Sequence, residues 1–473
     1  MIDRRRILYG SAGAALAAGM GGCATLPAPG AGGAVDPLIG DLQRRTFQYF
    51  WDTTDTRTGL APDRWPTKSF ASIAAVGFAL TAYGIGVARG WVTRAEARTR
   101  TLATLEFFAS APQGPAATGT SGHKGFFYHF LNMDDGTRFA RNELSTIDTT
   151  LLLGGVLFAQ SFFDGDDPDE KRIRTLADRL FNGPDWGWIR PRKPFVSMGW
   201  HPETGFIKSD WDGYHESLLL YILALATEEH PLEPETWGAF SARFEGSWGT
   251  YDGQQYLHYP AMFIHQYSHV WVDFRGIRDA YIATKGIDYF ENSRRATLAQ
   301  RAYAIRNPKR WAGYGPDIWG LTACDGPGDF ELTIGGVPRA FHSYSERGPG
   351  SRDDGTIAPT AAAGSIAFAP EVAVPAIQAM HARYGRGIWD RYGFRDSFNP
   401  TLTDTHGRRL QHGGIVPGVG WVDGDHLGID QGPIVCMIEN WRSGLVWQVM
   451  RRNPHIVRGL KRAGFGGGWL ATA

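Results

Sequence analysis

The chain has 473 residues, of which 43% are apolar and 20% charged, so it has enough apolar material for a large core and is not a disordered protein. Its 48 basic and 48 acidic side chains cancel, which argues against a nucleic-acid-binding protein and against an anionic polymer as the main substrate, although local charged patches stay open. Aromatic residues make up 13% of the chain. Trp and Tyr rings stack on the apolar faces of sugars, but a large core also uses many aromatic side chains.

Residues 1–35 have the pattern of an export signal followed by a tether. Three arginines at 4–6 precede an apolar stretch that is too short for a permanent membrane helix, which resembles a twin-arginine signal. Gly-Gly-Cys23 resembles a lipoprotein cleavage site, although Met20 stands where Leu is usual. We expect an exported, periplasmic protein, either anchored through a lipid on Cys23 or cleaved near Ala24 or Ala28 and released.

Residues 36–473 contain no obvious linker, so we expect a single domain and a monomer. Cys324 and Cys436 lie in apolar contexts and are expected to be buried, unpaired side chains. There is no CxxC, HExxH or phosphate-binding glycine motif, so we predict no metal site and no cofactor.

The spacing of apolar residues predicts mostly helices. At the expected start of one of them, Thr93 and Glu96 have the spacing of a capping box. The predicted helices are 41–51, 69–88, 92–108, 145–163, 167–181, 214–227, 297–307, 358–368, 370–384 and 432–450. Residues 125–131 and 330–337 are the best strand candidates. About a dozen helices separated by glycine-rich aromatic loops favour an all-α toroid of paired helices, with the functional residues on the loops at one end.

Carboxyl groups near the starts of apolar helices are candidates for acid–base chemistry, because glycoside hydrolysis uses two carboxyl groups and burial shifts their pKa values. Glu143 and Asp148 flank the start of the helix predicted at 145. Glu216 follows His215 before a run of leucines, and Asp430 precedes a Gly-Pro pair before another apolar helix. The alternative reading of each is helix capping, because acidic residues favour the positive end of the helix dipole.

Two loops and several tryptophans are candidates for substrate binding. Asp325 lies among small residues beside Trp319, and Asp354 precedes an alanine-rich segment that allows close approach of another group or of another helix. Tryptophans in glycine-rich loops are less easily explained as core than those in helices, so we interpret several as sugar-stacking residues. The predicted substrate-binding residues are Trp188, Trp200, His215, Trp271, Trp319, Asp325, Asp354 and Asp430.

The order of four motifs resembles the glycoamylase-like domain family of bacterial endo-β-1,2-glucanases, and is similar to the C-terminal part of cyclic β-1,2-glucan synthases. The motifs are WGLTACDGPG at 319–328, DGTIAPTAA at 354–362, FAPE at 368–371 and IDQGPIVCMIENWRSGLVW at 429–447. The resemblance covers almost the whole chain after the tether. Cys324 departs from it, because a serine is expected there.

The resemblance implies an (α/α)6 barrel that acts on β-1,2-linked glucose polymers without a cofactor. It implies that Glu216 is the general acid and that Glu143 or Asp148 is the partner that orders the water. Three alternatives remain: a β-1,2-glucan transglycosylase, a non-catalytic glycan-binding protein, and a polysaccharide lyase, which the neutral charge disfavours.

Overall fold

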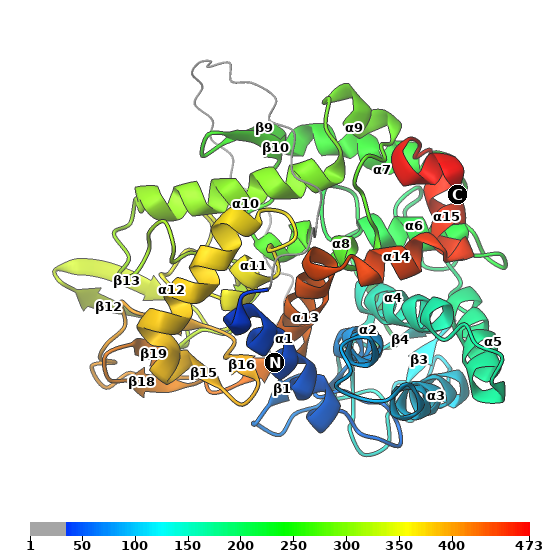
Figure 1. The fold of residues 1–473 in the computed structure, drawn as a ribbon, viewed down its shortest axis with the longest axis horizontal. Helices are drawn as coiled ribbons and strands as arrows, with labels where there is room; N and C mark the ends of the chain where they lie inside the picture. The colour runs from blue at the N-terminus through cyan, green and yellow to red at the C-terminus, as the bar shows by residue number, and fades with distance from the viewer. Residues whose placement is uncertain (1–34) are drawn as a thin grey trace.

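The structure, a computed structural model, describes residues 35–473, so the predicted export signal, including Cys23, lies outside the described residues. Six helices lie in the middle of the molecule and are buried on nearly every side (Figure 1). They are α2 (Ile73–Ala88), α4 (Thr146–Phe162), α6 (Leu218–Ala226), α8 (Tyr267–Trp271), α11 (Pro359–Ala363) and α13 (Gly428–Arg442).

Six further helices alternate with these along the chain and are buried on one side only, as the outer layer of a barrel requires. They are α1 (Pro37–Thr53), α3 (Arg94–Ser110), α5 (Pro168–Asn182), α7 (Glu235–Ser241), α10 (Tyr289–Arg306) and α12 (Pro370–Ile388). The two layers form the predicted (α/α)6 barrel. Shorter helices complete the fold: α9 (Ala280–Thr284), α14 (Leu445–Arg451), α15 (Pro454–Arg462), η1 (Ala242–Ser247), η2 (Met262–His265) and η3 (Gly468–Thr472).

The inner helices run in the same direction. A Cβ added at Gly77 of α2 would lie 2.1 Å from the carbonyl oxygen of Leu151 in α4, and one at Gly84 would lie 2.5 Å from the ring of Phe158. Contacts further along α2 are thus made further along α4, so the two helices are parallel. Gly432 of α13 lies in the same way against Phe78 of α2. The loops that begin these helices therefore meet at one end, which we call the N-terminal end of the barrel.

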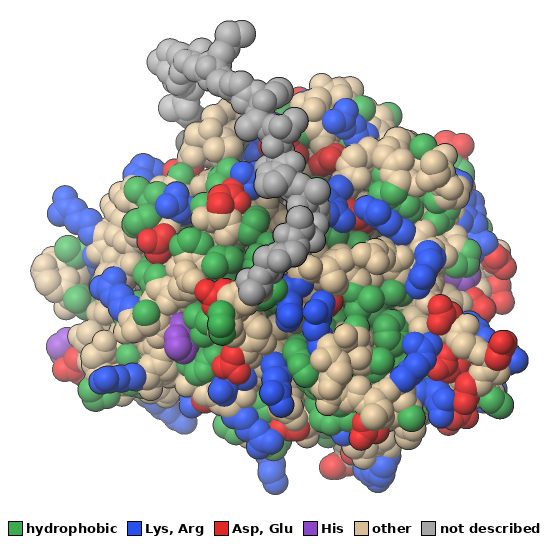
Figure 2. Space-filling model, in the orientation of Figure 1, with side chains coloured by type: hydrophobic (Ala, Val, Ile, Leu, Met, Phe, Trp, Pro, Cys, Tyr) green, Lys and Arg blue, Asp and Glu red, His purple; other side chains and the backbone are tan. Residues whose placement is uncertain are grey.

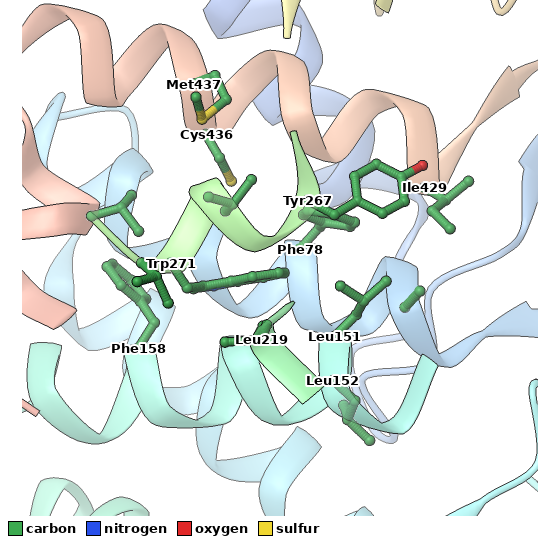
Figure 3. Close-up of a cluster of buried hydrophobic side chains, with 14 of the residues drawn as sticks. Phe78, Leu151, Leu152, Phe158, Leu219, Tyr267, Trp271, Ile429, Cys436 and Met437 are labelled. Atoms are coloured by element: carbon green, nitrogen blue, oxygen red, sulfur yellow. The ribbon is translucent and has the colours of Figure 1, made fainter. Parts of the chain in front are cut away.

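Large apolar side chains fill the space between the inner helices. Trp271 and Phe78 stack with their ring centroids 5.1 Å apart, and the ring of Tyr267 packs edge-on against that of Phe78 (Figure 3). Cys436 lies in the same cluster. Both Cys324 and Cys436 are fully buried and unpaired, as predicted, and burial raises the pKa of each thiol well above its ordinary value.

The strands are short and lie in the loops. The predicted strand at 125–131 is two short strands, 126–127 and 130–131, which pair with different partners. The predicted strand at 330–337 is the strand 330–334 and the turn of a hairpin whose second strand begins at Val337. The strands are β1 (Arg64–Trp65), β2 (Ala71–Ser72), β3 (Gly122–His123), β4 (Phe126–Phe127), β5 (Phe130–Leu131), β6 (Leu144–Ser145), β7 (Gly199–His201), β8 (Gly205–Phe206), β9 (Trp248–Tyr251), β10 (Gln254–Leu257), β11 (Ala323–Cys324), β12 (Phe330–Ile334), β13 (Val337–Phe341), β14 (Ser345–Glu346), β15 (Trp389–Asp390), β16 (Gly393–Phe394), β17 (Phe398–Asn399), β18 (Gly414–Val416), β19 (Gly420–Val422) and β20 (His426–Leu427). They pair in twos or threes, for example β6-β7-β8 and β17-β19-β18.

Helix boundaries follow local chemistry. The predicted capping box is present, with the Thr93 hydroxyl accepting from the Glu96 N–H and the Glu96 carboxylate accepting from the Thr93 N–H. The helix predicted over 432–450 is interrupted by Gly444, whose φ of 70° ends α13 and starts α14. Within residues 35–473, no helix is both long and apolar enough to cross a bilayer.

Candidate active site

The N-terminal end of the barrel gathers acidic side chains from loops far apart in sequence. Asp148 lies in the first turn of α4, Glu216 two residues before α6, and Asp430 in the first turn of α13. Because the inner helices are parallel, the positive ends of their dipoles share this end of the barrel and favour negative charge there. The acidic residues form three groups.

The first group, which we call the histidine group, is His129, Glu143 and Asp148. The ring of His129 lies between the two carboxylates, with Nδ1 3.0 Å from Glu143 Oε1 and Nε2 3.4 Å from Asp148 Oδ1. The Asp148 carboxylate also accepts a hydrogen bond from the Ser145 hydroxyl. The same hydroxyl accepts a hydrogen bond from the Asp148 N–H, and this second bond is the predicted helix cap. Capping and carboxylate pairing therefore coexist, and Glu143 is the more exposed acid.

The second group, the Glu216 group, is Glu216, Tyr259 and Glu346. The backbone oxygen of Glu216 accepts from the Ser268 hydroxyl at 3.0 Å, which ties the start of α6 to α8. The Tyr259 hydroxyl is hydrogen-bonded to Glu346, and the charge of Glu216 also acts on Tyr259. Burial raises the pKa of Glu346 above its ordinary value, so this pocket of the protein favours a protonated carboxyl group.

His215 lies at the edge of the Glu216 group. Its ring is 6.2 Å from that of Tyr259 and 5.7 Å from that of Trp211, centroid to centroid. Burial lowers the pKa of His215 to about 4, so the imidazole is neutral at pH 7. Its Nδ1 is buried and has no hydrogen-bond partner among the described residues.

The third group, the arginine group, surrounds Arg64 at the start of β1. Arg64 Nη1 donates to Asp325 Oδ2 at 2.6 Å, and the Asp325 N–H donates to Asp396 Oδ2 at 2.7 Å. Asp423 lies beside Asp325, and Asp396 is hydrogen-bonded to Asp430. These four acids are almost completely buried.

One arginine cannot neutralise four close carboxylates, so protons must be retained. Burial raises the pKa of Asp396 well above its ordinary value, and the charges of Asp430 and Asp325 raise it further. Burial also raises the pKa of Asp423 well above its ordinary value, and the charges of Asp325 and Asp396 raise it further. Conversely, burial alone would lower the pKa of Arg64, but Asp325 and its neighbours raise it. Asp396 and Asp423 therefore keep their protons to a higher pH than exposed carboxylic acids do.

Asp325, His412 and Asp423 place one ligand atom each within 4.8 Å of one another, a spacing that a metal ion could accept. However, Arg64 Nη1 donates to Asp325 and also lies 3.3 Å from His412 Nδ1. The guanidinium therefore supplies the positive charge at this place, and we interpret the cluster as an ion pair with shared protons.

The three groups are connected through short strands. β11 and β14 pair Ala323 with Glu346, so the Glu216 group and Asp325 lie on either side of one ladder. On the other side, the Gly428 N–H donates to the carbonyl of Asp63, which precedes Arg64, and the Ile73 N–H donates to the carbonyl of His129. All three groups thus belong to one set of loops at the N-terminal end of the barrel.

Two of the predicted tryptophans lie in a partly exposed aromatic cluster. The rings of Trp188 and Trp200 have centroids 5.6 Å apart, and His123 lies 5.1 Å and 5.2 Å from them. Trp200 is in β7, which pairs with β6 directly before Asp148. These rings are therefore placed beside the histidine group.

The other predicted binding residues lie elsewhere. Trp271 is fully buried in the core, and its indole N–H donates to Thr81, so no sugar can reach its face; Trp319 is also buried. Asp354 is fully buried and receives two hydrogen bonds from Arg347, whose positive charge holds the pKa of Asp354 below its ordinary value despite burial. This ion pair supports the loop behind Asp325, since Arg347 also donates to the Cys324 carbonyl. We therefore leave these three out of the proposed site.

Several residues of the site were not among the predicted ones: Arg64, His129, Tyr259, Glu346, Asp396 and Asp423. Asp396 did not meet the criterion used for the others, because it lies in a loop segment between α12 and α13 and not at the start of a helix. Arg64 and His129 gave no signal either, since a single basic residue in a loop has no periodicity, and only the tertiary fold shows which acids it meets.

Comparison with known proteins gives a consistent result. Residues 208–454 match the family model Glycoamylase, described as putative glucoamylase. A crystal structure of a putative glucoamylase from Bacteroides uniformis is similar to this chain with a TM-score of 0.78 and 30% identity, covering 91% of this chain and 98% of that one. An endo-β-1,2-glucanase from Chitinophaga pinensis, solved with sophorotriose and glucose, gives a TM-score of 0.76 and 27% identity over 91% of this chain and 98% of the other.

A curated relative is also similar along most of this chain. The chain is 27% identical over 460 residues to an exo β-1,2-glucooligosaccharide sophorohydrolase (non-reducing end) from Parabacteroides distasonis. The match covers 90% of this chain but 58% of the relative, so the chain spans somewhat more than half of that protein's length.

Proposed function

Since the chain belongs to the Glycoamylase (putative glucoamylase) family, we propose that it is a glycoside hydrolase that cleaves β-1,2-linked glucan, either internally or by releasing sophorose. The observation that carries the proposal is the convergence of the Glu216 group with two further carboxylate groups at one end of an (α/α)6 barrel. The names of the two β-1,2-glucan-cleaving relatives support the linkage.

In this proposal Glu216 is the general acid. It lies before an apolar helix, beside the neutral imidazole of His215 and near Tyr259, whose hydroxyl is held by Glu346. An acid that donates a proton to the leaving oxygen must stay protonated near neutral pH, and partial burial among aromatic groups favours this.

The partner that activates water comes from one of two groups. Glu143 or Asp148 of the histidine group is the partner that the sequence indicates, and His129 keeps both carboxylates in place. Asp396 and Asp430 of the arginine group are the alternative, because a hydrogen-bonded pair of acids can give up a proton and take it back. Substituting each of these acids by its amide shows which group supplies the water-activating residue. Loss of that residue should lower kcat about 10²–10⁴-fold.

The central test is Glu216→Gln. We expect at least a 10²-fold loss of kcat on linear β-1,2-glucan, measured as new reducing ends, with an unchanged Tm. Glu235→Gln, at an exposed acid in the outer helix α7, is the matched control and should be fully active. A fully active Glu216→Gln protein would exclude Glu216 from the chemistry.

The same assay distinguishes the other functions. A transglycosylase would transfer glucose units to an added acceptor with few new reducing ends. A lyase would produce unsaturated sugars that absorb ultraviolet light. A glycan-binding protein would bind β-1,2-glucan without turnover.

We also propose that the protein is exported and lipid-anchored through Cys23, on the strength of the arginines at 4–6 and the Gly-Gly-Cys sequence. Fractionation of cells that express the full chain should place it with membranes. Cys23→Ala should release it into the soluble exported fraction, whereas an unchanged distribution would contradict the anchor.

A further inference from the structure

A buried arginine joins two parts of the candidate active site. On the face in Figure 2, basic and acidic side chains lie interspersed at the surface, whereas the side chain of Arg138, in the loop between β5 and β6, is 1% exposed. Its five contacts match the five N–H groups of a guanidinium. The acceptors are the carbonyl oxygens of Ala117 and Asn142, both carboxylate oxygens of Glu203, and Nδ1 of His201. We call Arg138 and these partners the Arg138 network.

One side of the Arg138 network holds Glu143. Arg138 Nε donates to the Asn142 carbonyl oxygen at 2.7 Å, and this carbonyl belongs to the peptide bond that leads into Glu143. The Glu143 carbonyl in turn accepts from the His129 N–H at 2.9 Å. Both peptide groups of Glu143 are therefore held, which limits where its carboxylate can lie beside His129.

The other side of the Arg138 network holds the hairpin of β7 and β8. Arg138 Nη1 and Nη2 donate to the two carboxylate oxygens of Glu203 at 2.7 Å and 3.1 Å, and Nη2 also lies 3.4 Å from His201 Nδ1. Bidentate pairing of this kind fixes direction as well as distance. Glu203 lies in the turn of the hairpin, and Trp200 of the aromatic cluster lies in its first strand.

The strand pairing of this hairpin is short. The β6–β7 ladder has two residue pairs, Leu144 with Trp200 and Ser145 with Gly199, and β8 is the edge of this three-stranded sheet. A ladder of this length does not by itself fix the far end of the hairpin. Arg138 fixes that end, because it binds the turn to the same loop that carries Glu143.

We propose that Arg138 is a positioning residue, which sets the place of a glucose unit stacked on Trp200 relative to the Glu143 carboxylate. The inference rests on the proposed function and deepens it, because it makes the histidine group the source of the water-activating acid. Since its side chain is buried, Arg138 acts through Glu143 and the hairpin and not on the sugar itself.

The test is Glu203→Gln, which leaves Arg138 in place but removes the charge of its bidentate partner. We expect kcat on linear β-1,2-glucan to fall about 10–10²-fold, since a displacement of about 1 Å near the reacting groups can cost about 10²-fold. Arg138→Lys should give a similar loss, because an ammonium group keeps the charge but cannot make the same fork of hydrogen bonds.

The matched control is Glu233→Gln. Glu233 is likewise the exposed partner of a buried arginine, since the side chain of Arg190 is 3% exposed and donates to it at 2.6 Å. The other acceptors of Arg190 are the Pro194 carbonyl and the Thr236 hydroxyl, which belong to none of the three acidic groups. Glu233→Gln should lower the Tm about as much as Glu203→Gln and leave kcat unchanged.

A second comparison separates positioning from a general loosening of the fold. In a Trp200→Ala background, Glu203→Gln should lower kcat less than it does in the wild type, because no stacked sugar then remains to be placed. Fully additive effects, or equal kcat for Glu203→Gln and Glu233→Gln, would overturn the proposal and leave the proposed function intact. A wild type that cleaves no β-1,2-glucan would instead contradict the proposed function itself, and the positioning role with it.

Discussion

At the scale of single residues, the site depends on which groups share protons and which hold others in place. His129 contacts Glu143 and Asp148 through its two ring nitrogens, so it orients both carboxylates. The sequence located the two acids, because both flank the start of a helix, but not the histidine that joins them. The prediction for Trp271 was wrong in another way. It was interpreted as a sugar-stacking residue in a loop, but its side chain is fully buried in the core.

We predict that His129→Asn lowers kcat about 10²-fold and changes KM less, because a small displacement of a catalytic carboxylate is enough for such a loss. The pH profile should also change, since the two acids would lose their common partner and repel each other. The measurement is a pH series of kcat and KM on β-1,2-glucan. His230→Asn, at an exposed histidine, is the control, and an unaltered pH profile in His129→Asn would show that the histidine is structural only.

At the scale of elements, glycines set how closely the inner helices approach. A Cβ at Gly155 of α4 would lie 2.1 Å from the Gly77 carbonyl oxygen in α2, which is backbone and cannot move aside. The sequence predicted both helices to within a few residues, because their apolar runs are long. It did not predict the short helices α8, α9 and α15, whose lengths of five to nine residues leave too few turns for a periodic pattern.

We predict that Gly155→Ala lowers the free energy of unfolding by about 3 kcal/mol or prevents folding, because overpacking against backbone has no cheap relief. Gly40→Ala is the matched control: Gly40 lies in the outer helix α1 with nothing within 4 Å of an added Cβ. That substitution should stabilise the protein by about 0.5–1 kcal/mol through helix propensity. Equal effects of the two substitutions in chemical denaturation would contradict the close packing of α2 and α4.

At the scale of the whole molecule, the arginine group couples stability to pH. Asp396 and Asp423 have pKa values raised above those of the unfolded chain, so the folded state retains protons that the unfolded state releases. Their contribution is most favourable below the unfolded pKa and is lost as the pH rises from there through the raised folded values. The fold thus accommodates the site at a cost in stability near neutral pH.

We predict that Asp396→Asn raises the Tm at pH 7 and that the difference from the wild type shrinks as the pH falls toward 4. The amide oxygen can still accept from the Asp325 N–H, and an amide takes up no proton on folding, so the cost that Asp396 carries at pH 7 is removed. Activity on β-1,2-glucan should fall if the arginine group supplies the water-activating acid. Thermal unfolding from pH 4 to pH 8 measures the effect, and a Tm difference independent of pH would contradict the raised pKa.

The filled interior of the barrel has a consequence for how a polymer is handled. Phe78, Tyr267 and Trp271 leave no passage along the barrel axis, so a glucan cannot thread through the protein. Substrate must arrive and both products must depart on the same side, across the loops that carry the three acidic groups. Repeated cleavage of one chain would then require lateral sliding over that surface, and loop length alone would decide how many sugar units extend beyond each side of the cut.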